Sequence, residues 1–179
     1  MAEQTFTSGQ ILTAAQMTAL QKNTGLAWIS STTVGASVAS VNITNAFSAT
    51  YDNYRIVLSG GTGSTTQAIA MQLGSSTTGY YGILSYVSYA TGLTTTATTN
   101  NGASFVFVGE TSSTNQLVSI DVFNPYLAKF TNMNGPYVGS ISGMVAGYHG
   151  VATSYTDFTL SVAGSINGGT VSVYGYRKG

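Results

Sequence analysis

The chain has 179 residues, of which only 6% are charged, and five basic residues balance five acidic residues to a formal net charge of zero. Acid–base catalysis and metal ligation need ionisable groups at fixed spacings, so this composition predicts no enzyme activity, no catalytic residues, no cofactor and no metal site. Zero net charge gives no basic field for nucleic acid, and no stretch approaches 18 consecutive apolar residues, so we expect neither nucleic-acid binding nor membrane insertion.

The surface must instead be built from hydroxyls, amides and tyrosine rings, because the chain holds 27 Thr, 22 Ser and 12 Tyr. A neutral surface lacks the self-repulsion that keeps copies of a protein apart, which predicts an oligomer or a larger assembly. The chain has no cysteine, so its stability must come from packing and hydrogen bonding.

The N-terminal residues Met1–Gln10 are polar and lack the basic start and apolar stretch of a secretory signal. We therefore expect a protein that is made in the cytoplasm and reaches the outside by another route. Thr13 then begins a Thr-Ala-Ala-Gln capping box, which predicts one short α-helix of about three turns that ends near Asn23.

A helix this short is marginal in water unless it packs against something, either its own domain or another protein. The second alternative makes residues 1–25 a docking segment. Its expected contacts are Phe6, Ile11, Leu12, Met17 and Leu20, together with Trp28 at the junction with the body.

From residue 26 to residue 179 the chain is typical of β-structure, with β-branched and aromatic residues between Gly, Asn, Ser and Thr. The expected strands are 27–33, 37–43, 54–59, 68–73, 80–89, 105–109, 116–123, 138–148, 156–162 and 170–176. Alternation such as Phe158, Leu160 and Val162 indicates that one face of each strand is buried. These short strands predict a mainly β, antiparallel, jelly-roll-like β-sandwich body.

Two polar segments, Gly60–Thr66 and Thr91–Gly102, are expected to be exposed loops or ribbons. Gly139, Gly143 and Gly147 recur every four residues, which indicates close approach of another backbone in sheet packing or in a subunit contact.

No enzyme signature accompanies these elements. The single histidine, His149, is expected to lie at the surface or at a strand end, and no Gly-x-Ser-x-Gly nucleophile elbow is present. The five carboxylates are scattered without a close pair.

Four tyrosines, Tyr80, Tyr81, Tyr86 and Tyr89, lie close together in the sequence. Flat rings flanked by hydroxyl and amide groups suit sugars, so these residues are candidates for a glycan-binding face. Core packing and subunit contacts would use the same residues, and both alternatives stay open.

Three segments resemble small exterior structural proteins of tailed bacteriophages. TFTSGQILTAAQMTAL (Thr5–Leu20) is similar to the Phe-x-x-Gly-x-x-Leu-Thr-Ala-Ala opening of such proteins, and YDNYRIVLSG (Tyr51–Gly60) and the ending GGTVSVYGYRKG look like their β-sandwich bodies. The resemblance implies a virion component, made in the host cytoplasm, that docks by its N-terminal segment to other virion proteins and projects its body outward, commonly as a homotrimer.

The resemblance leaves three functions open. The first is a tail-fibre or host-adhesion module that contacts a host surface glycan, and it is the one we expect. The second is a capsid decoration, or cement, protein that stabilises the head. The third, a glycan depolymerase, is disfavoured by the small number of ionisable residues.

Overall fold

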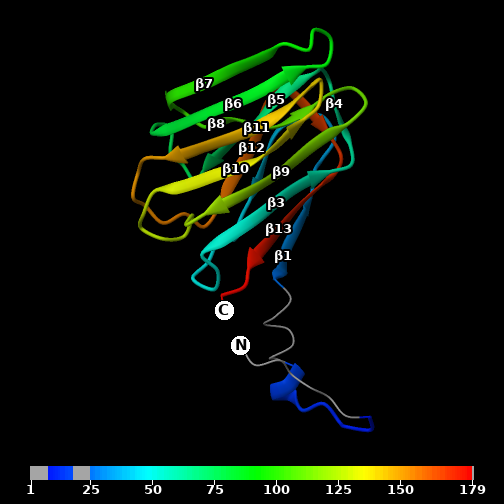
Figure 1. The fold of residues 1–179 in the computed structure, drawn as a ribbon, viewed down its shortest axis with the longest axis vertical. Helices are drawn as coiled ribbons and strands as arrows, with labels where there is room; N and C mark the ends of the chain where they lie inside the picture. Colours follow the sequence, from blue (N-terminus) through cyan, green and yellow to red (C-terminus); the bar gives the residue numbers. More distant parts are fainter. Residues whose placement is uncertain (1–7, 18–24, 179) are drawn as a thin grey trace.

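The computed structural model describes residues 8–17 and 25–178. The described chain is mainly β, with one short helix at residues 14–17 and strands that pair only antiparallel (Figure 1). In chain order the strands are β1 Leu26–Thr33, β2 Val38–Ile43, β3 Asn53–Ser59, β4 Thr62–Gly63, β5 Gln67–Leu73, β6 Tyr80–Ser88, β7 Thr94–Gly102, β8 Phe105–Thr111, β9 Gln116–Phe123, β10 Thr131–Val138, β11 Ile141–His149, β12 Phe158–Asn167 and β13 Thr170–Tyr176.

The strands form one sheet that branches at β9. One edge of β9 pairs with β3, while its other edge pairs with β8 near its start and with β10 near its end. The first branch therefore runs β1-β13-β3-β9-β10-β11-β6-β7, and the second runs β2-β12-β5-β8, with β4 attached to β12. The sandwich and jelly-roll details stay predictions, because β9 joins both branches into a single sheet.

One hydrophobic core lies between the branches. Apolar residues alternate with polar ones in both, as in Ile69, Met71 and Leu73 of β5, so each branch turns one apolar face inward. The ring of Tyr80 in β6 meets the ring of Phe105 in β8 edge to face, at 5.0 Å. Phe47 similarly contacts Tyr54 and Phe158, which belong to different branches.

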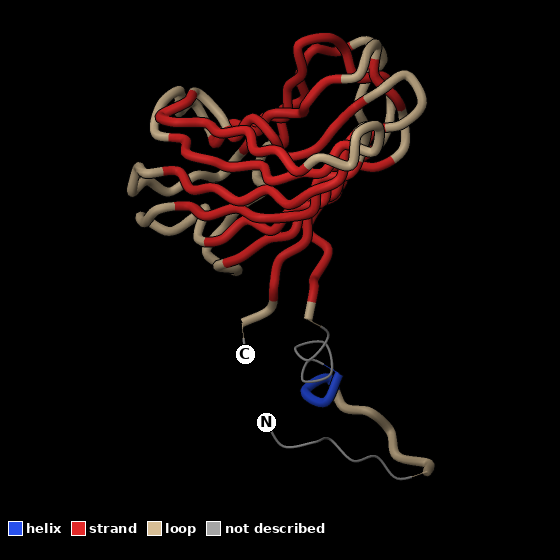
Figure 2. The backbone as a smooth tube through the Cα atoms, turned by 45° about the horizontal axis from the view of Figure 1, so that its top comes forward, coloured by secondary structure: helices blue, strands red, loops and turns tan. Residues whose placement is uncertain are grey.

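The predicted helix start is confirmed. The Gln16 backbone N–H donates to the Thr13 hydroxyl at 3.2 Å, and the Thr13 N–H donates to the Gln16 side-chain oxygen at 2.9 Å. These two bonds are the reciprocal pair of a capping box. The predicted end of the helix lies outside the described residues. Figures 1 and 2 show the described part, residues 8–17, apart from the strands, beyond the end of the body where β1 begins.

All ten strands expected from the sequence are present, with ends shifted by a few residues, but two long strands were missed. The segment Thr91–Gly102, expected to be an exposed loop or ribbon, is largely exposed, but Thr94–Gly102 is a regular strand, β7, and not a loop. Threonine is β-branched and favours a strand, and a strand at the edge of a sheet needs no apolar pattern. β10 was missed because its sequence TNMNGPYV contains residues that usually mark turns.

Candidate functional site

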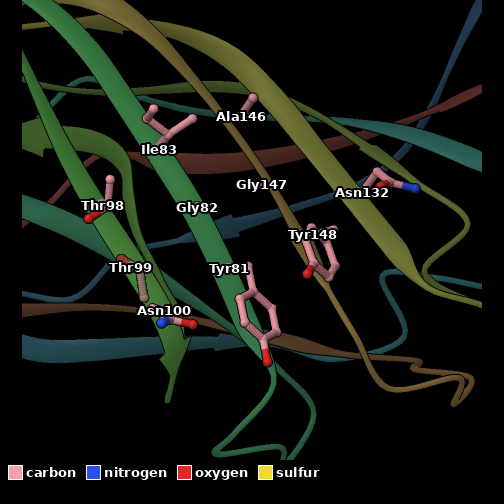
Figure 3. A pocket seen from close by; sticks show the side chains of 10 residues that line it. All are labelled: Tyr81, Gly82, Ile83, Thr98, Thr99, Asn100, Asn132, Ala146, Gly147 and Tyr148. Atoms are coloured by element: carbon pink, nitrogen blue, oxygen red, sulfur yellow. The ribbon is translucent and has the colours of Figure 1, made fainter.

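A groove of about 490 Å³ lies on the outer face of the first branch, the face turned away from the core. It crosses four neighbouring strands, β10, β11, β6 and β7, in that order. Figure 3 shows the residues that line it, which are Tyr81, Gly82, Ile83, Thr98, Thr99, Asn100, Asn132, Ala146, Gly147 and Tyr148.

Strand register brings these residues together from two distant parts of the sequence, the β6–β7 hairpin and the β10–β11 hairpin. Tyr81 of β6 lies directly opposite Tyr148 of β11, and two residues along the strands Ile83 lies opposite Ala146. Asn132 of β10 is also directly opposite Tyr148, across the edge of β11 that faces away from β6. Because side chains alternate between the faces of a strand, each of these residues turns outward while its neighbours turn to the core.

The central feature of the groove is a pair of stacked tyrosine rings. The ring centroids of Tyr81 and Tyr148 are 4.8 Å apart and their planes differ by 11°. Phe130, just before β10, continues the stack on the far side of Tyr148, with a centroid separation of 6.1 Å and an angle of 15°. Tyr148 is 40% exposed and Phe130 is 52% exposed, so the stack presents aromatic surface to solvent.

Gly147 sets how closely the two ring-bearing strands approach. A Cβ atom at this position would lie 2.5 Å from the Tyr81 carbonyl oxygen and 3.2 Å from the Gly82 Cα. Only a residue without a side chain fits there. The predicted close approach of another backbone is confirmed at Gly143, against Ser85, and at Gly147, against Tyr81. At Gly139 it is wrong, because the close neighbour there is the side chain of Glu110.

The ten lining residues include no Asp, Glu, His, Lys or Arg. They offer the exposed parts of the aromatic rings, the hydroxyls of Thr98 and Thr99, and the amides of Asn100 and Asn132. Such a lining suits a neutral ligand that has apolar C–H surfaces and a rim of hydroxyl groups, because rings bind the first and amides bind the second. A sugar ring has both.

The four tyrosines singled out from the sequence do not form one face. Tyr81 lines the groove, and Tyr89 is 65% exposed just beyond the end of β6. Tyr80 is buried, and its hydroxyl accepts the Leu73 N–H at 2.8 Å. Tyr86 is partly buried and packs against the core. Tyr80 and Tyr86 thus occupy the positions that the alternative of core packing assigned to them.

Asn132 and Tyr148, which line the groove, and Phe130, which stacks on Tyr148, were not predicted from the sequence. Asn132 belongs to β10, whose strand character was not recognised. Its signal was the alternation of Met133, Gly135 and Tyr137, each buried, with exposed residues between them.

The predicted docking residues that the structure describes are exposed. Ile11 is 88% exposed, and Leu12 and Met17 are also exposed in the segment that lies apart from the strands. Trp28 is exposed on β1, and its indole N–H donates to the Ser31 hydroxyl at 3.2 Å. Phe6 and Leu20 lie outside the described residues.

His149 ends β11 as expected but is fully buried, so the surface position was wrong. Its Nε2 lies 3.0 Å from the Thr78 carbonyl oxygen and 2.9 Å from the Ser76 hydroxyl. A carbonyl oxygen only accepts, so Nε2 carries the proton and does not take one from Ser76. Burial lowers the pKa of His149, which keeps the ring neutral. The contacts hold the turn between β5 and β6 against β11.

A second hollow, of about 290 Å³, is polar and opens beside the buried Glu110 of β8. The Glu110 carboxylate accepts hydrogen bonds from the Tyr137 hydroxyl at 3.2 Å, from the Ser140 hydroxyl at 2.8 Å and from the Ser140 N–H. Burial and the neighbouring carboxylate raise the pKa of Tyr137, so its hydroxyl remains a donor. These bonds tie β8 to the turn between β10 and β11.

Within residues 8–17 and 25–178, no three His, Cys, Asp or Glu side chains gather as a metal site would require. In the same part of the chain, no helix has both the length and the apolar character to cross a membrane. No protein-family model, curated protein or solved structure matches this chain.

Proposed function

We propose that this protein is a non-enzymatic structural protein on the exterior of a bacteriophage virion, where it acts as a tail-fibre or host-adhesion module. Its N-terminal segment docks to other virion proteins, and its β body projects outward and contacts a host surface glycan through the groove. The stacked Tyr81 and Tyr148 rings, flanked by amide and hydroxyl groups, are the observation that carries the proposal.

The N-terminal segment supports the docking role. Ile11, Leu12 and Met17 expose apolar side chains to solvent, which costs free energy unless another surface covers them. The capping box fixes the start of the helix before any partner binds. The phage assignment itself rests on the resemblance of the sequence segments, and the groove supports the adhesion role.

The binding test compares two tyrosine variants on intact host cells and on their isolated surface polysaccharide. Tyr148→Ala removes the middle ring of the stack, and we expect the affinity to fall about tenfold, which corresponds to about 1.4 kcal/mol. Tyr89→Ala is the matched control, because it removes an exposed tyrosine that does not line the groove. Equal binding by both variants would argue against the groove as the contact surface.

The position on the particle is tested by labelling residue 179 with gold and viewing intact virions by electron microscopy. Label at the tail tip is the expected result. Label over the head would instead favour capsid decoration. In that case, the double variant Ile11→Asp and Met17→Asp of this protein should no longer bind to heads, and those heads should resist heat less well.

A further inference from the structure

β7 (Thr94–Gly102) is an edge strand of the sheet, and most of its residues are exposed. β7 is the last strand of the first branch and pairs with β6 alone. Figure 1 shows it along the top of the body with no strand beyond it. The N–H and C=O groups on its outer side therefore have no strand partner among the described strands.

Over residues 94–99, β7 lacks the features that usually keep edge strands apart, and its register shift lies beyond them. Edge strands are commonly protected by lysine, proline or a bulge. The sequence TTTATTNNG contains no charged residue and no proline. The pairing with β6 becomes irregular only between Tyr80 and Gly82, opposite the end of β7, so residues 94–99 form a regular run.

We propose that β7 pairs antiparallel with β7 of a second copy of this chain, so that two copies share one continuous sheet. Zero net charge removes electrostatic repulsion between the copies. The outward side chains of Thr94, Thr96 and Thr98 would lie opposite threonine or asparagine of the second copy, and such cross-strand pairs form hydrogen bonds. A two-fold axis perpendicular to the sheet keeps the outer faces of both copies on the same side.

The pairing would also complete the groove. Thr98, Thr99 and Asn100 form one wall of it, and the other side of that wall is the free edge of β7. A second copy extends this wall and joins two Tyr81–Tyr148 stacks on one surface of double length. Only this use of the joined surface rests on the proposed function, since the strand pairing needs no ligand.

Antiparallel self-pairing makes a prediction that disulfides can test. Only one residue of β7 lies beside the two-fold axis and directly opposite the same residue of the second copy. The two Cα atoms are then about 4.5 to 5.5 Å apart, which is within disulfide range. The residues two positions before and after it lie opposite each other. Because the chain has no cysteine, each cysteine introduced reports on its position alone.

The experiment places a single cysteine at each position from 94 to 99 of the full chain and applies mild oxidation. One position is expected to cross-link with itself, and the positions two residues on either side of it only with each other, in a mixture of the two variants. Ser85→Cys is the control, because Ser85 is exposed on the same face but one strand inward, on β6. Equal cross-linking at Ser85 and along β7 would overturn the proposal.

The mass in solution provides an independent readout. Light scattering should give twice the chain mass of 18.4 kDa for the unmodified protein. Thr96→Lys with Thr98→Lys should give the single-chain mass with an unchanged circular dichroism spectrum, whereas Ser85→Lys should stay dimeric. A monomeric or trimeric mass for the unmodified protein would contradict two-fold pairing. Tyr148→Ala should remain dimeric, so loss of glycan binding and loss of pairing are separate results.

Discussion

At the scale of single residues, the fold depends on places where a side chain would not fit. Gly147 is the clearest, because its hypothetical Cβ lies 2.5 Å from the Tyr81 carbonyl oxygen, which is fixed by the sheet. Gly82 on the facing strand differs, since a Cβ there would lie 3.6 Å from the Ala146 oxygen, an ordinary contact. The two glycines are direct partners in the register and form a matched pair.

We expect Gly147→Ala to lower the free energy of unfolding by about 1 to 3 kcal/mol, because β11 and β6 must move apart to admit the methyl group. Gly82→Ala should change it by less than about 1 kcal/mol. Urea denaturation of both variants measures the difference. Equal losses would mean that the strands do not approach as closely as the structure indicates.

The same scale shows what the sequence could and could not reveal about the candidate site. Alternation along β6 already separates Tyr80 and Tyr86 from Tyr81, so their different faces were predictable once the strand was accepted. The partnership of Tyr81 with Tyr148 was not, because it depends on a register between strands that are far apart in the sequence. Local patterns carry no information on such pairings.

At the scale of elements, β10 and β7 show why polar strands escape prediction. Proline has no backbone N–H, so it is tolerated only where no neighbouring strand needs that donor. Pro136 of β10 lies beyond Asn134, the last residue that pairs with β9, so no β9 carbonyl is left without a donor there. β7 escapes because an edge strand can expose both of its faces. The strands with clear apolar alternation were predicted. The polar strands β7 and β10 were not, because their strand structure depends on pairing with neighbouring strands and not on their own sequence.

Glu110 of β8, in the second branch, is hydrogen-bonded to β10 and the turn after it, in the first branch. We expect Glu110→Ala to lower the free energy of unfolding by about 3 kcal/mol, because it leaves the donors on Tyr137 and Ser140 without their charged acceptor. Glu110→Gln keeps one acceptor oxygen and should cost less. The control is Thr114→Ala, which lines the same polar hollow from an exposed position and should change stability by less than about 0.5 kcal/mol. Urea denaturation at pH 7 distinguishes the three variants.

At the scale of the whole molecule, stability depends on pH through groups whose pKa the fold shifts. His149 is one, because burial lowers its pKa. Asp121 is another: burial raises its pKa, but hydrogen bonds from Arg55, 2.8 and 2.6 Å long, and from Tyr176, 2.6 Å long, outweigh burial and lower it. Both groups bind protons more readily in the unfolded chain.

Stability should therefore fall in two steps as the pH decreases. The unfolded chain takes up a proton at His149 below about pH 6.5, which removes the first part of the stability, and at Asp121 below about pH 4, which removes the second. His149→Gln should abolish the first step alone, even if it lowers stability at every pH. Thermal unfolding between pH 8 and pH 3 measures both steps, and an unchanged slope near pH 6 in His149→Gln would contradict this origin.

The order in which the strands are synthesised differs greatly from their order in the sheet. β3 lies between β9 and β13, so neither of its neighbours exists when β3 leaves the ribosome, and its second edge is covered only after Tyr176 has been made. During most of translation the second edge of β3 therefore has no strand partner. Such non-local pairing forms slowly and leaves strand edges unpaired, so the nascent chain is open to aggregation until β13 has been made.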